Sequence, residues 1–145
     1  CGCATHLGAC SAGTADHVGE WQLVGQKLGM AFQIVDDVLD LTGDSATCGK
    51  TLGTDLATAK PTLPVLLALQ AASEEQCVRW IANLNDRTLD ASQVQEWLCA
   101  TGAIDESIRR AKTMVREALD FTDQQRPEVA AAFQELGRFL LSRTH

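Results

Sequence analysis

The sequence predicts an all-α fold, a helical array whose members are joined mostly by short connections. No stretch alternates apolar and polar residues with the period of two that a half-buried strand shows, and tyrosine is absent. Apolar residues instead recur every three or four positions, as they do on one face of a helix. Glycine and proline interrupt this pattern and indicate where one helix ends and the next begins.

The first part of the chain contains the longest expected helix. A helix over about residues 2–13 carries Ala, Leu and Cys at helical spacing, and Gly13 to Asp16 end it and cap the next one. The helix over about residues 17–42 is apolar nearly all round, which is typical of a buried helix. Glycines then open a loop, at positions 43, 49 and 53.

Shorter helices are expected in the rest of the chain. Because proline is tolerated in the first turn of a helix, Pro64 places a helix start near Pro61 or Thr62. Ser73 and Gln76 have the spacing of a capping box for the helix that follows. Three further helices are expected, with Gly102 and Pro127 between them, at about residues 90–100, 102–122 and 126–143.

Composition excludes several classes of function. The 145 residues suffice for one domain with a core. The net charge is −7 and the longest basic cluster is the pair Arg109-Arg110, which argues against a nucleic-acid partner. No apolar run has the roughly 20 residues needed to cross a bilayer, and no signal peptide is evident, so we expect no transmembrane segment and a cytoplasmic protein.

The six cysteines have irregular spacing, which favours free thiols in a reducing compartment. Cys1, Cys3, His6 and Cys10 are the one arrangement with some likeness to a zinc site. Zinc ligands usually combine a C-x2-C pair with a distant second pair, and this arrangement lacks that spacing.

An aspartate cluster lies near the end of the long helix. Asp36 and Asp40 are four residues apart, so they lie about 40° apart around the helix axis. Asp37 lies one step round the helix, and Gln33 extends the polar stripe by one turn. A solvated acidic face is the ordinary interpretation of such a cluster.

Two observations favour a metal site over a solvated face. The segment from Met30 to Ser45 contains no Lys or Arg, so like charges four residues apart have no local counter-charge. The neighbouring residues are apolar, and burying unpaired carboxylates among them would be costly. Mg²⁺ takes oxygen ligands and commonly completes its shell with water and substrate phosphates. We therefore interpret Asp36, Asp37 and Asp40 as ligands for Mg²⁺.

Two lysines flank the glycine-containing loop. Lys50 and Lys60 are the only basic residues between Lys27 and Arg79. The lysine ammonium suits phosphate oxygens, and glycines allow a backbone to approach a ligand closely. Composition alone leaves open that these are two surface lysines on a loop.

The segment over residues 28–65 closely resembles a known motif region. It contains Phe32-Gln-Ile-Val-Asp-Asp-Val-Leu-Asp40, then Gly49-Lys50, Gly53-Thr-Asp-Leu56 and Lys60-Pro-Thr-Leu-Pro-Val65. This order and spacing resemble the second aspartate-rich region of the trans-isoprenyl diphosphate synthases. The resemblance extends in weaker form over the whole chain. It implies that residues 1–145 are the C-terminal portion of a polyprenyl synthase domain, part of an isoprenoid-synthase-type helix bundle.

The resemblance implies a role for each matched residue. Asp36, Asp37 and Asp40 match the DDxxD motif that helps to hold Mg²⁺ on an allylic diphosphate. Gln33 matches a glutamine lining the same site, and Lys50 and Lys60 match lysines that neutralise the departing diphosphate. In this family the allylic C–O bond ionises, isopentenyl diphosphate attacks the carbocation, and a proton is lost. Family members generally form homodimers.

The sequence also departs from the family pattern. The family pattern also has a first DDxxD motif and, one to two turns before the position of Cys1, a Lys-Thr pair, and neither of these upstream features is in this sequence. We therefore expect the chain alone to bind metal weakly and not to catalyse. Three alternatives stay open: a class I terpene cyclase, a non-catalytic partner subunit of a prenyl synthase, and a purely structural helical bundle.

Overall fold

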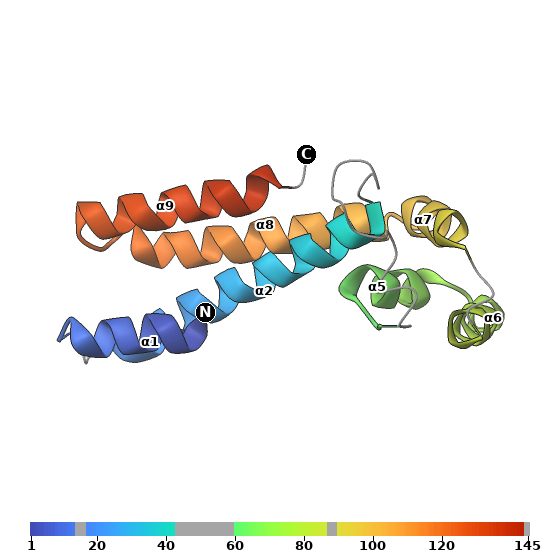
Figure 1. Cartoon of the computed structure of the whole chain (residues 1–145), viewed down its shortest axis with the longest axis horizontal. Helices are drawn as coiled ribbons and strands as arrows, with labels where there is room; N and C mark the ends of the chain where they lie inside the picture. The colour runs from blue at the N-terminus through green and yellow to red at the C-terminus, as the bar shows by residue number, and fades with distance from the viewer. Residues whose placement is uncertain (14–16, 43–59, 87–89, 144–145) are drawn as a thin grey trace. The chain divides into compact units, whose positions relative to one another are not determined.

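The computed structural model describes residues 1–13, 17–42, 60–86 and 90–143. These residues contain seven helices and no strand, so the predicted all-α class is confirmed. The helices, labelled as in Figure 1, are α1 (Gly2–Ser11), α2 (Val18–Thr42), α5 (Leu63–Ala71), α6 (Glu74–Asn85), α7 (Ala91–Ala100), α8 (Ala103–Thr122) and α9 (Pro127–Ser142).

The chain forms two compact units. The first consists of residues 1–35 and 110–145, and the second of residues 36–109. Helices α2 and α8 contribute residues to both units because each crosses a boundary between them. None of the helices in the described ranges is long and apolar enough to cross a membrane.

In the first unit, α1 packs directly against α2 through glycine. A Cβ added to Gly25 would meet the Thr5 hydroxyl oxygen, and it would lie 2.8 Å from both the Cys1 carbonyl oxygen and the Gly2 Cα. Real Cβ atoms essentially never approach other atoms so closely. The backbones of α1 and α2 therefore approach each other at a point where only glycine fits.

Helices α8 and α9 complete the first unit as a hairpin and lie side by side in Figure 1. A Cβ added to Gly137 of α9 would lie 3.1 Å from side-chain atoms of Val115 and Leu119 on α8, so this pair of helices is also closely packed. Trp21 of α2 makes an edge-to-face contact with Phe121 of α8, with ring centroids 5.2 Å apart. Aromatic pairs of this geometry stabilise a fold beyond the area that they bury.

The second unit has its own apolar core. Buried residues from the end of α2, from α5 and α7, and from the start of α8 form one cluster: Leu41, Val65, Ala68, Val94, Leu98 and Ala103. Trp80 of α6 and Trp97 of α7 stack at 4.1 Å between ring centroids with 13° between the rings, and both pack against this core.

The caps that end and begin these helices agree with the sequence pattern. Gly13 and Gly102 both have positive φ, at 73° and 69°, and each follows the end of a helix. The capping box at Ser73 is present, with the backbone N–H of Gln76 donating to the Ser73 hydroxyl at 3.3 Å. Asp90 and Gln93 form a second capping box, which was not predicted from the sequence.

Helix α2 is less completely buried than its composition predicted. Val24, Leu28 and Val35 are buried, but Leu23 is 54% exposed and Met30 49% exposed. The prediction of a helix buried on all faces was therefore wrong for the part of α2 in the first unit. Apolar content measures how much of a helix could be buried, whereas packed neighbours determine how much is buried.

Candidate functional site

The three aspartates lie on the last two turns of α2 and differ in burial. Asp37 is buried, with 10% of its side chain exposed, whereas Asp36 and Asp40 are only half-buried. Leu41, one turn after Asp37, belongs to the core of the second unit. Asp37 therefore lies on the face of α2 that turns toward this core, and its carboxylate needs a counter-charge.

Lys60 supplies that counter-charge. Its ammonium nitrogen lies 3.3 Å from Oδ1 of Asp37, within range of an ion pair and a hydrogen bond. Lys60 comes just before α5, and Val65 of α5 is in the same core cluster as Leu41 of α2. Packing of α5 against the end of α2 thus brings together two residues that are 23 positions apart in the chain.

The other predicted site residues are distributed differently. Gln33 is exposed on α2, three residues before Asp36. Lys50 and the glycines at 43, 49 and 53 lie outside the described residues. Of the predicted site residues, Gln33, the three aspartates and Lys60 are among the described residues. An ion pair joins Asp37 to Lys60.

The oxygen donors at the end of α2 suit a cation that takes its remaining ligands from elsewhere. Within the described ranges, no three His, Cys, Asp or Glu side chains gather as a ready-made metal-ligand group. Two neighbouring positions of one helix point about 100° apart, so Asp36 and Asp37 diverge. Carboxylate oxygens nevertheless suit Mg²⁺, which commonly takes one or two carboxylates from a protein and completes its shell with phosphate and water. The residues fit a metal that is shared with a bound phosphate ligand.

The cysteine cluster near the N-terminus gives no support to a zinc site. No group of metal ligands forms there among the described side chains, and His6 Nδ1 lies 3.3 Å from Oε1 of Gln22. Cys1, Cys3 and Cys10 are free and exposed.

Thr62 is a feature of this region that sequence reasoning missed. Its hydroxyl is buried and has no hydrogen-bond partner within the described part of the chain. Thr62 is the N-cap residue of α5, yet its side chain makes no capping hydrogen bond. A buried hydroxyl without a partner is costly, and this one lies two residues from Lys60. The sequence feature that could have pointed to Thr62 is its place as a lone polar residue between Pro61 and Pro64.

Comparison with known proteins identifies the family. The family model described as polyprenyl synthetase matches residues 1–101, more than half of the chain. The chain belongs to the polyprenyl synthetase family. Decaprenyl-diphosphate synthase subunit 1 from Schizosaccharomyces pombe is 36% identical to it over 120 residues, which cover 83% of this chain and 30% of the relative.

Solved structures of polyprenyl synthetases have the same fold. The polyprenyl synthase from Caulobacter crescentus, complexed with calcium and isoprenyl diphosphate, superposes with a TM-score of 0.84 and 29% identity over 99% of this chain and 45% of that one. A decaprenyl diphosphate synthase from Rhodobacter capsulatus gives a TM-score of 0.86 with 26% identity, over 99% of this chain and 46% of that one. The predicted isoprenoid-synthase-type helix bundle is thus confirmed as the fold.

The chain spans about a third of the length of three curated relatives that it matches. Those relatives are all named as polyprenyl diphosphate synthases, with decaprenyl, nonaprenyl and octaprenyl products in their names.

Proposed function

We propose that this chain carries a diphosphate-binding site of a prenyltransferase that condenses an allylic diphosphate with isopentenyl diphosphate. The observation that carries the proposal is the pair formed by buried Asp37 and Lys60. The aspartate cluster and the Lys60 ammonium lie at one place. This arrangement suits a diphosphate that an ammonium group binds directly and that carboxylates hold through a metal ion. Membership of the polyprenyl synthetase family supports the same activity.

Each residue has a proposed role. Asp36, Asp37 and Asp40 would hold Mg²⁺, and Gln33 would contact the same ligand one turn earlier. When bound, Mg²⁺ would stabilise the negative charge on the leaving diphosphate. The Lys60 ammonium, together with that of Lys50, would bind the diphosphate oxygens and stabilise the charge that develops as the allylic C–O bond breaks.

The wider context of the activity is also proposed. The substrates would be an allylic diphosphate and isopentenyl diphosphate, and the double bond of the second would attack the first before a proton is lost. Residues 1–145 would form one portion of a polyprenyl synthase domain that acts as a homodimer in the cytoplasm.

Binding of inorganic pyrophosphate tests the site directly. We expect isothermal titration to detect pyrophosphate binding to the chain in the presence of Mg²⁺ and a clear loss of affinity without it. Asp37→Asn and Lys60→Met should each weaken this binding by about tenfold, because charge-assisted hydrogen bonds to ionised groups are worth about 1.5–3 kcal/mol.

Matched substitutions control for non-specific charge effects. Asp105 and Lys112 are exposed residues of α8. Asp105→Asn and Lys112→Met make the same changes in net charge at residues that have no proposed role in the site, and they should leave pyrophosphate affinity unchanged. Equal losses in all four variants would show that net charge governs binding and would refute the site.

Catalysis by the 145-residue chain is a separate question. The three aspartates of the proposed metal site all lie on α2, whereas the family resemblance implies a second aspartate cluster facing them. We expect pyrophosphate binding without turnover when magnesium, an allylic diphosphate and isopentenyl diphosphate are supplied. Hydrocarbon products, instead of a longer diphosphate, would support the terpene cyclase alternative.

A further inference from the structure

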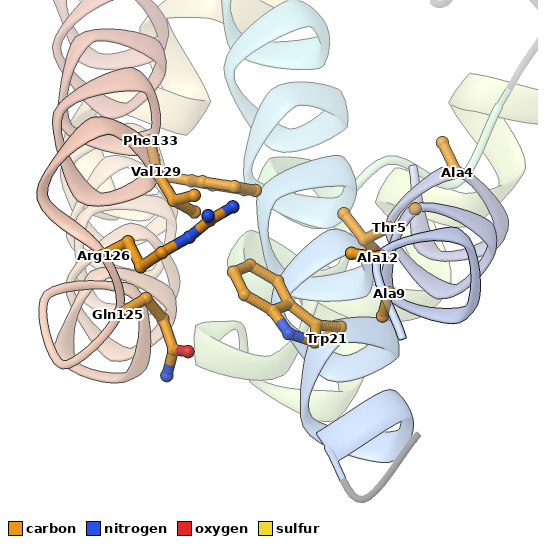
Figure 2. Close-up of a pocket in the computed structure, with 10 residues that line it drawn as sticks. Ala4, Thr5, Ala9, Ala12, Trp21, Gln125, Arg126, Val129 and Phe133 are labelled. Atoms are coloured by element: carbon orange, nitrogen blue, oxygen red, sulfur yellow. The ribbon is translucent and has the colours of Figure 1, made fainter. Parts of the chain in front are cut away.

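An apolar pocket of about 520 Å³ opens in the first compact unit. Figure 2 shows Trp21 of α2 between the small side chains of α1 on one side and Val129 and Phe133 of α9 on the other. Ligand pockets for small molecules usually have volumes of about 300–1,000 Å³ and mainly apolar linings. The pocket therefore has the size and the lining of a small-molecule site.

The walls of the pocket are held by packing. The Trp21 and Phe133 rings lie 5.5 Å apart between centroids, and Trp21 also contacts Phe121 edge-on. On the opposite wall, a Cβ added to Gly8 would meet no atom within 4 Å, so α1 presents open space there. The aromatic rings lie opposite a helix surface that has no projecting side chain at Gly8, and this arrangement suits the narrow alkyl chain of a ligand.

Arg126 gives the pocket a single charge. It is the one charged residue in the lining, and Figure 2 shows its side chain extending into the space beside Trp21. Its guanidinium makes no hydrogen bond or ion pair with the residues that the structure describes. The neighbouring Gln125 differs, because its amide already donates to the Phe121 carbonyl oxygen at 3.3 Å. In a chain of net charge −7, Arg126 is thus a local positive charge beside apolar walls.

We propose that this pocket binds a single-chain amphiphile with an anionic head group. The apolar chain would lie against Trp21, Phe133 and the open surface at Gly8, where it loses contact with water. The carboxylate or phosphate head would accept hydrogen bonds from the Arg126 guanidinium, which can bind such groups through two N–H donors. All of the lining residues are in the first unit, whereas the aspartates and Lys60 are in the second, so the pocket is a different site from the one proposed for diphosphate.

The fluorescence of Trp21 provides the test. The chain is titrated with dodecanoate and with dodecyl phosphate, below their micelle concentrations and without metal, and with dodecanol as the uncharged equivalent. We expect saturable changes in fluorescence that are lost in Trp21→Phe, because Trp80 and Trp97 belong to the other unit. Absence of saturable binding by both anions would overturn the proposal.

Two variants separate the contribution of the ligand's head group to binding from that of its alkyl chain. Arg126→Gln should weaken binding of both anions about threefold to fivefold, as expected for a solvent-exposed charge pair, and should leave dodecanol unaffected. Gly8→Leu should abolish binding of all three ligands because its side chain fills the pocket, with circular dichroism showing that the helices persist. Gly19→Leu is its matched control, since Gly19 of α2 also has no atom within 4 Å of an added Cβ and does not line the pocket.

Other outcomes would contradict the proposal in distinct ways. Anion binding that survives Gly8→Leu would place the amphiphile elsewhere on the surface. Equal affinity of the wild type and Arg126→Gln would remove the anionic head group from the proposal. A dimer in sedimentation experiments that becomes a monomer in Gly8→Leu, together with no ligand binding, would show that a second copy of the chain fills the pocket.

Discussion

The ammonium nitrogen of Lys60 lies 3.3 Å from Oδ1 of Asp37, which joins a residue that precedes α5 to a buried carboxylate on α2. Both residues have proposed roles toward other partners, Asp37 toward Mg²⁺ and Lys60 toward diphosphate. The ion pair would therefore have to break when the two ligands bind: Asp37 would exchange Lys60 for Mg²⁺, and Lys60 would exchange Asp37 for diphosphate. Binding of metal and of diphosphate is then expected to be mutually favourable, because each releases the residue that the other needs.

Removal of the Lys60 ammonium should have opposite effects on the two ligands. In Lys60→Met, we expect Mg²⁺ alone to bind more tightly, because the metal no longer competes with an ammonium for Asp37, whereas pyrophosphate binds more weakly. Titration of each ligand separately measures both changes. If Mg²⁺ affinity falls along with pyrophosphate affinity, partner exchange is refuted and Lys60 supports the site only structurally.

The same substitution should also lower stability. Breaking a fully buried ion pair costs about 3–5 kcal/mol, but Lys60 is 47% exposed, so we expect about 1–2 kcal/mol in urea unfolding. The double variant Asp37→Asn, Lys60→Met should be more stable than Lys60→Met, since no carboxylate is left without its ammonium. A double variant that is less stable would indicate that the two residues act independently.

Gly25 should not tolerate a methyl group. We expect Gly25→Ala to lower the free energy of unfolding by roughly 1–3 kcal/mol, because its Cβ would overlap Cys1, Gly2 and Thr5 of α1. Gly8→Ala in α1 is the matched control. Its Cβ meets nothing within 4 Å, so the higher helix propensity of alanine should stabilise the chain by about 0.5–1 kcal/mol. Similar effects of the two substitutions in thermal unfolding would contradict the close approach of α1 and α2.

The Lys27–Glu117 pair should make stability depend on pH. Lys27 donates a hydrogen bond to Glu117 at 2.8 Å and also attracts its charge, which lowers the pKa of the Glu117 carboxyl in the folded chain below its ordinary value. A lowered folded-state pKa contributes stability above the unfolded-state pKa, and that contribution is lost as the pH falls through the folded-state pKa. Glu117→Gln should therefore be less stable than the wild type near pH 7.

The difference between these two chains should shrink as the pH falls below about 4, where glutamate carboxyls become protonated. It should also shrink in high salt, because both side chains are partly exposed. Glu135→Gln, an exposed change on α9, serves as the control and should show neither trend. A constant difference across this pH range would rule out the ion pair as its cause.

The capping box at the start of α6 should contribute measurably to stability. Ser73→Ala removes the acceptor of the backbone N–H of Gln76, and loss of such a cap typically costs about 1 kcal/mol. Urea unfolding measures the change. Ser73→Asp should restore most of the loss, because aspartate is an equally good N-cap, and failure to restore it would point to a role other than capping.

The helices could be predicted from sequence because local rules determine where they begin and end. Gly13, Gly102, Pro64 and the Ser73–Gln76 pair act within a few residues of their own positions, and the structure places helix ends at each of them. Exposure of Leu23 and Met30 could not be predicted in this way. It depends on which helices pack against α2, and apolar periodicity describes one helix at a time.

The candidate site shows the same limit. The aspartates were identified from their spacing on one helix, and the absence of Lys and Arg from positions 31–44 suggested that their counter-charge came only from metal. The structure adds a protein counter-charge from Lys60, which reaches Asp37 because α5 packs beside the end of α2. That pairing follows from tertiary packing and has no local signature in the sequence.

The stacked indoles of Trp80 and Trp97 give the second unit an optical signature of its own. Parallel rings 4.1 Å apart couple their electronic transitions, so their circular dichroism in the ultraviolet should contain a pair of bands of opposite sign. The band pair disappears when α6 and α7 separate, whereas emission from Trp21 reports on the first unit. One molecule thus contains two independent reporters, and coincident melting of both signals would mean that the two units unfold as one cooperative body.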